Sequence, residues 1–61
     1  MKRTILVDNE YWTITKFETI KTGIVNWQVV DIKNHLVTNY DKLGTYHHEI
    51  IRDAKINNLL D

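Results

Sequence analysis

The chain contains no cysteine, no serine and no proline, and only two glycines. Without cysteine it has no disulfides, which often compensate for the small core of a very small domain. Three histidines without a thiolate are a poor ligand set for structural zinc. Serine and cysteine are also the commonest nucleophiles of covalent catalysis. The domain must therefore be held together by its core or by self-association.

An excess of charge of either sign is also missing, because 8 basic and 8 acidic residues cancel. No net field draws the chain towards nucleic acid or anionic lipid, and zero net charge favours association. The longest apolar run, Ile5-Leu6-Val7, is too short for a membrane span, and the Met-Lys-Arg start lacks the apolar core of a signal peptide. Neither glycine lies in a phosphate-binding pattern. We therefore expect a cytoplasmic protein with no cofactor and no membrane contact.

A chain of 61 residues is expected to form a single domain over residues 1–61. This length is close to the lower limit at which one hydrophobic core outweighs the entropy of the unfolded chain. Neither a disulfide nor a metal site is expected to add stability here. We therefore predict a homo-oligomer, most simply a homodimer, and leave its exact state open.

Period-two alternation predicts strands in the first two thirds of the chain, and a period of 3.6 predicts a helix after Gly44. Lys21-Thr22-Gly23 has the pattern of a three-residue hairpin loop whose glycine adopts a positive φ. Thr45 is the predicted N-cap of the helix, which is expected to run to about Asn57 or Asn58, and Asn58 is considered as a left-handed C-cap. The fold class is α+β, a small antiparallel sheet of three or four strands (a β-meander) followed by one C-terminal helix packed on one face. The strands are expected at about 3–7, 11–20, 24–32 and 36–41, and the helix at about 45–57.

A three-residue loop fixes which residues face each other across the central hairpin. Ile14 then lies opposite Val30, and Phe17 lies opposite Trp27 on the other face. One helix covers only one face of a sheet, and we assign it to the face that carries Ile14. The expected core is Leu6, Trp12, Ile14, Val30, Ile32, Tyr46, Ile50 and Ile51.

The face opposite the helix is expected to carry large apolar side chains, and the end of the helix adds more. Exposed groups of this size indicate a contact surface for a partner or for self-association. The alternative is that both tryptophans complete a small core. The expected contact surface is Phe17, Trp27, Val29, Ile56, Leu59 and Leu60.

The pair His47-His48 is the only cluster that suggests a metal or acid–base site. Adjacent helical residues diverge by about 100°, whereas two ligands on one face need i, i+3 or i, i+4 spacing. No ligand residue stands at those positions. We therefore expect two surface histidines, no metal site and no enzyme.

Nucleic-acid binding is the main alternative. Trp27-Gln28-Val29 and Leu43-Gly44-Thr45-Tyr46 resemble the tryptophan strand and helix entry of the AP2 and integrase arm-binding families, which read DNA with a three-stranded sheet backed by one helix. Those families place several arginines on the sheet. Here Arg3 and Arg52 are the only arginines, so the base readout that this resemblance implies lacks its best side chain.

These observations rank the function classes. A small non-catalytic protein-binding module comes first, and neutral proteins of this size are often viral or mobile-element modulators or inhibitors that occupy a host protein surface. A weak or structure-specific nucleic-acid binder is second, and an enzyme is third. The expected partners are a second copy of the chain and a protein whose identity the sequence does not indicate.

Overall fold

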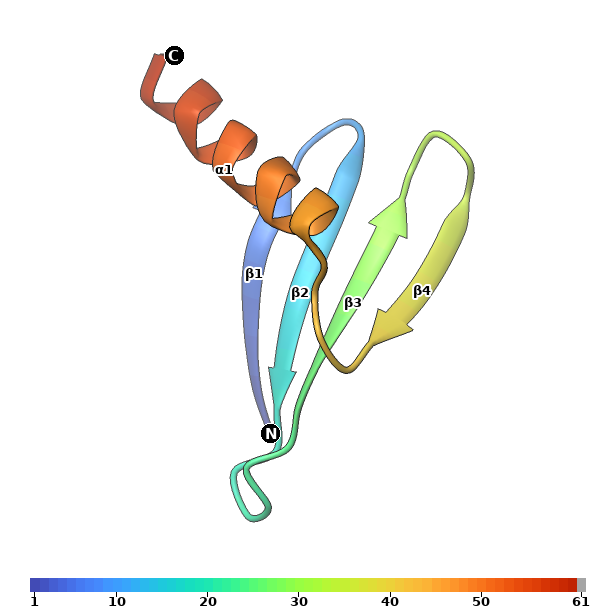
Figure 1. Cartoon of the computed structure of the whole chain (residues 1–61), viewed down its shortest axis with the longest axis vertical. Coiled ribbons are helices and arrows are strands. Elements are labelled where there is room, and N and C mark those ends of the chain that lie inside the picture. The colour runs from blue at the N-terminus through green and yellow to red at the C-terminus, as the bar shows by residue number, and fades with distance from the viewer. Residues whose placement is uncertain (61) are drawn as a thin grey trace.

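The computed structural model describes residues 1–60, with side chains for residues 1–56. It confirms the α+β fold, in which a four-stranded antiparallel meander is followed by one helix (Figure 1). Consecutive strands are neighbours throughout, in the order β1-β2-β3-β4. The elements are β1 (Lys2–Asp8), β2 (Trp12–Glu18), β3 (Val25–Asp31), β4 (Leu36–Tyr40) and α1 (Thr45–Leu60).

The loop between β2 and β3 is one residue longer than predicted. The Gly23 N–H donates to the Thr19 carbonyl at 2.8 Å, and the Thr19 N–H donates to the Ile24 carbonyl at 2.9 Å. Gly23 has φ 71°, the left-handed conformation expected of it. Because the loop spans residues 20–23, Thr19 and not Ile20 lies opposite Ile24.

This extra residue shifts the register of the central hairpin. Ile14 lies opposite Val29, not Val30, and Trp27 lies opposite Lys16, not Phe17. A one-residue slip moves every side chain of a strand to the other face. The predicted faces of β2 are therefore kept, whereas those of β3 are exchanged.

Three core assignments are corrected by the structure. Val30 lies opposite Thr13, on the face without the helix, because of the register shift. Ile32 is in the turn after β3 and is 37% exposed. Tyr46 is 61% exposed, because it lies in the first turn of α1 at the rim of the covered face.

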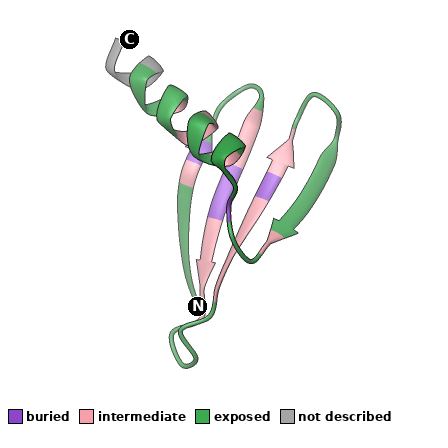
Figure 2. Cartoon of the chain, in the orientation of Figure 1, coloured by how far each residue is buried: buried purple, intermediate pink, exposed green. Residues whose placement is uncertain are grey.

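The observed core lies between α1 and one face of the sheet (Figure 2). Ile14 is completely buried, and Leu43 joins the core from the segment that leads from β4 to the helix. Leu43 was not predicted, because an isolated apolar residue between two elements carries no periodic signal. The buried hydrophobic residues are Val7, Ile14, Val29 and Leu43, and Leu6, Trp12, Trp27, Tyr40, Ile50, Ile51 and Ala54 pack against them.

The N-cap of the helix lies one residue earlier than predicted, and the helix itself begins at Thr45. The His48 N–H donates to the Gly44 carbonyl at 3.2 Å, the first helical bond, so that Gly44 is the N-cap residue and not Thr45. The Gly44 N–H in turn donates to Nδ1 of His47 at 3.2 Å. His47 thus takes the position of the glutamate or glutamine in a capping box. The helix continues to Leu60, beyond the end expected at about Asn57 or Asn58.

No helix in residues 1–60 is long and apolar enough to cross a membrane.

Candidate protein-binding groove

The helix covers only part of its sheet face. The α1 backbone lies against β1, and the ribbon runs away from β4 (Figure 1). Over β3 and β4 the face is crossed by the segment 41–44 and approached by the first helical turn. A concave surface, which we call the aromatic groove, is left between this turn and the sheet.

Two adjoining hollows of about 270 and 200 Å³ make up the aromatic groove. Both are lined by Trp12, Asp31 and Tyr46, which lie at the start of β2, the end of β3 and the start of α1. The first hollow adds Tyr11, Lys33 and Asn34, and the second adds Val29, Leu36, Thr38, Tyr40 and His47.

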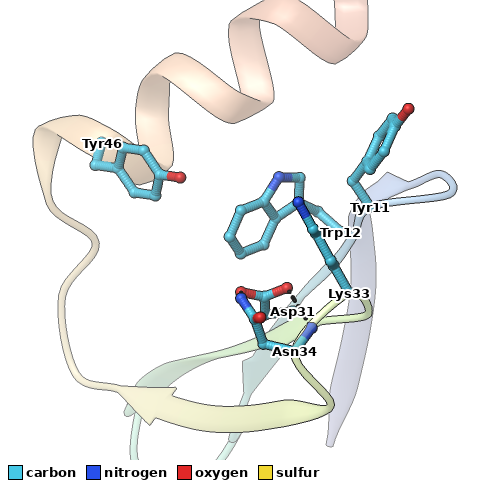
Figure 3. Close-up of a pocket in the computed structure, with 6 residues that line it drawn as sticks. All are labelled: Tyr11, Trp12, Asp31, Lys33, Asn34 and Tyr46. Atoms are coloured by element: carbon cyan, nitrogen blue, oxygen red, sulfur yellow. Dashed lines mark hydrogen bonds between the residues drawn. The ribbon is translucent and has the colours of Figure 1, made fainter.

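Aromatic side chains form the wall of the first hollow. The rings of Trp12 and Tyr46 meet edge to face, with centroids 6.0 Å apart at an interplanar angle of 80°. This is a favourable arrangement for an aromatic pair. Figure 3 shows Trp12 between Tyr46 and Tyr11, and Tyr11 is also 61% exposed. The groove therefore presents large aromatic surfaces that solvent reaches.

The polar floor of this hollow is built by the turn between β3 and β4. Asp31 accepts a hydrogen bond from the Asn34 N–H at 3.2 Å and another from Asn34 Nδ2 at 2.8 Å (Figure 3). An aspartate that caps its own turn in this way orders the loop. His35 follows with φ 56°, the left-handed residue that completes the reversal. The floor is thus a fixed carboxylate and amide, and the Lys33 side chain lines the same hollow.

His47 and Tyr40 close the second hollow. Their rings lie 4.6 Å apart at an angle of 54°, so that the imidazole packs on the phenol. The same imidazole accepts the Gly44 N–H through Nδ1. His47 therefore fixes the first helical turn, and with it the position of Tyr46, over the sheet.

The groups in the groove that resemble acid–base catalysts are already engaged. Both oxygens of Asp31 accept hydrogen bonds from Asn34, and Nδ1 of His47 accepts one from Gly44. No group of three or more His, Asp or Glu side chains in the described part of the chain could hold a metal ion. The arrangement is suited to recognition by shape, aromatic contact and a few hydrogen bonds.

The predicted contact residues do not form one surface. Phe17 is half-buried on the open sheet face, whereas Trp27 packs against the core and Val29 is buried in it. Trp27 and Val29 were misplaced by the register shift. Ile56 is 46% exposed on α1, and the side chains of Leu59 and Leu60 lie outside the described residues.

Two groove residues that the sequence analysis did not select are Asp31 and Asn34. The sequence feature that could have indicated them is their i, i+3 spacing at the end of a strand, since both residue types favour turns. Tyr11 was also not selected, because a tyrosine at a strand start gives no sign of which way it points. Tyr46 was assigned to the core and lies instead at the rim of the groove.

The sheet face opposite the helix is open and nearly uncharged. Ile5 and Val37 are 55% and 59% exposed there. In the observed register this face carries Arg3, Ile5, Asp8, Thr13, Thr15, Phe17, Asn26, Gln28, Val30, Val37 and Asn39, so that one residue of each charge lies on it, both on β1. It therefore mixes apolar side chains with neutral polar ones.

Comparison of the chain with protein-family models, with curated proteins and with solved structures finds no significant match.

Proposed function

We propose that this protein is a small non-catalytic module that binds another protein through the aromatic groove and acts in the cytoplasm as a homodimer. The observation that carries the proposal is the edge-to-face pair of Trp12 and Tyr46 above the hydrogen-bonded pair of Asp31 and Asn34. Aromatic side chains surrounded by a few ordered polar groups are the usual composition of an interface hot spot.

The division of the groove into two small hollows favours the side chains of a protein over one small substrate. Each hollow, of about 270 or 200 Å³, is smaller than the range of small-molecule sites, which starts at about 300 Å³. Each has room for one or two side chains of a partner. The module would act by occupying a functional surface of that partner, as viral and mobile-element modulators of host proteins do.

The proposed homodimer is supported by the surface that one chain leaves exposed. The accessible area is 4995 Å², whereas the size rule for compact monomers gives roughly 4,200 Å² for 7.3 kDa. The radius of gyration of 12.2 Å also exceeds the roughly 10.5 Å of a compact chain of this length. One copy is thus less compact than a typical stable monomer.

Capture from lysate of the native host, before and after nuclease treatment, tests the binding proposal. The tagged wild-type chain is compared with Tyr11→Ala and Tyr46→Ala, which remove exposed groove surface. Ile20→Ala is the control, because Ile20 is 73% exposed at the tip of the β2–β3 loop, away from the groove. Circular dichroism of each variant establishes that the fold is retained.

The captured protein is then purified and titrated directly by calorimetry. We expect each tyrosine variant to weaken this complex by about tenfold or more, which corresponds to about 1.4 kcal/mol. The control should bind as the wild type does. Equal affinity for all the chains would contradict a role of the groove.

Nucleic-acid binding remains the second candidate because of one feature of the open face. Asn26, Gln28 and Asn39 project from β3 and β4 there, and such amides read adenine edges. The face has Arg3 as its only cation, so few phosphates would be neutralised. A tight complex with duplex DNA, whose salt slope implies six or more phosphate contacts, would favour this candidate over protein binding.

A further inference from the structure

The two edges of the sheet differ in their protection against pairing. The β1 edge carries Lys2, Arg3 and Asp8 and is interrupted by a bulge between Ile5 and Val7. Charges and bulges are the devices with which proteins block an edge strand. The β1 edge is therefore protected.

The β4 edge has none of these devices. Its sequence Leu-Val-Thr-Asn-Tyr contains no charge and no proline, and its pairing with β3 is regular. Leu36 and Val37 are both 59% exposed on it. No other element lies beside its outer side in the described chain (Figure 1). An uncharged edge strand of this kind is a template for another strand.

The β4 sequence also complements itself. If two copies pair antiparallel about a twofold axis at Thr38, all five residues of β4 are paired. Leu36 then lies opposite Tyr40 of the second copy, an apolar–aromatic pair, and Thr38 lies opposite Thr38, a favourable combination. Beyond the strand, Asp41 reaches the level of His35 of the second copy, where an imidazole N–H can donate to the carboxylate.

We infer that the β4 edge is the homodimer interface and that two copies join there into one continuous eight-stranded sheet. This inference deepens the homodimer of the proposed function by naming its surface. The whole chain exposes 4995 Å², about 800 Å² more than the size rule gives for a compact monomer, and an interface of standard size buries about 800 Å² on each partner. Both aromatic grooves then lie on the same face of the joined sheet, because residues paired across the axis share a face.

Opposite charges at the twofold axis test this interface. Thr38→Lys and Thr38→Glu each place like charges directly opposite each other in the dimer, whereas an equimolar mixture places lysine opposite glutamate. Thr4→Glu is the matched control, since Thr4 is an exposed threonine on the β1 edge. Sedimentation of the purified chains at about 100 µM should show a wild-type dimer. Each Thr38 variant alone should raise the dimer Kd at least tenfold. The equimolar mixture should bring the Kd back to the wild-type value, and Thr4→Glu should not change the Kd.

The absence of cysteine permits a direct test of the register. Residues that face each other in an antiparallel pair have Cα atoms about 4.5 to 5.5 Å apart, within the range of a disulfide. Thr38→Cys should therefore form an intermolecular disulfide under mild oxidation, whereas Thr4→Cys should remain reduced under the same conditions.

Three results would overturn the inference. The first is a wild-type mass of about 7 kDa at concentrations up to roughly millimolar. The second is a dimer that Thr4→Glu disrupts while Thr38→Glu does not. The third is a mixture of the two Thr38 variants that does not regain the wild-type dimer Kd. All these measurements use the purified chain without a partner. Failure of the groove proposal would appear only in the capture and calorimetry with the tyrosine variants, so the two failures are distinguishable.

Discussion

The two halves of the helix-covered face are closed to different degrees. Over β1 and β2, the helix packs Ile50 and Ile51 against the core to which Val7 and Ile14 belong, and Ile14 is completely excluded from solvent. Over β3 and β4 the cover is only the segment 41–44 and the first helical turn. The aromatic groove is found on this second half.

This difference follows from where the helix begins and how it runs. A single helix crosses two or three strands at most, and α1 runs towards and beyond β1 (Figure 1). The β3–β4 half, which the helix does not cover, is bordered mainly by aromatic side chains at the rim of the groove. Stability is thus concentrated in the β1–β2 half, and the surface available for recognition is in the β3–β4 half.

Ile14→Ala should have the largest effect, because it removes the most buried side chain of the closed half. We expect a loss of about 2 to 5 kcal/mol, which is enough to unfold a domain of this size. Circular dichroism melts at a fixed protein concentration measure this effect. A folded variant with an unchanged melting temperature would show that the closed half does not carry the stability.

Val29→Ala and Val30→Ala form a matched pair on neighbouring positions of β3. Val29 is 5% exposed in the core, whereas Val30 is half-buried on the open face. Val29→Ala should cost about 1.5 to 3 kcal/mol, and Val30→Ala less than about 1 kcal/mol. Urea unfolding measures both. A larger loss of stability for Val30→Ala than for Val29→Ala would support the register predicted from the sequence.

His47→Ala should have a smaller effect than Ile14→Ala or Val29→Ala, and it tests the boundary between the halves. It removes the acceptor for the Gly44 N–H and the contact with the Tyr40 ring. We expect a loss of about 1 to 2 kcal/mol. His48→Ala, at an exposed position, should stay within about 0.5 kcal/mol of the wild type. Equal unfolding midpoints in urea for the two variants would contradict the capping role of His47.

Much of the fold was predictable because its signals are local. The alternation in β2 placed Trp12 and Ile14 on one face and Phe17 on the other, as observed. Gly23 indicated the turn, and Gly44 marked the change from strand period to helix period. The groove was not predictable in the same way, because Trp12, Asp31 and Tyr46 are far apart in the sequence and none belongs to a periodic pattern that points to a site.

The sequence by itself determined the class of fold, the order of the elements and the side of β2 that is buried, because these depend on periodicity and on turn residues within short windows. Only the tertiary structure decided which face of β3 is buried. That choice depended on one extra residue in the loop after Thr19, and both faces of β3 carry apolar side chains, so the alternation of β3 alone favoured neither. The partial cover that leaves the groove open was likewise decided by the direction of α1 across the sheet, which depends on the packing of Leu43, Ile50 and Ile51 against the strands.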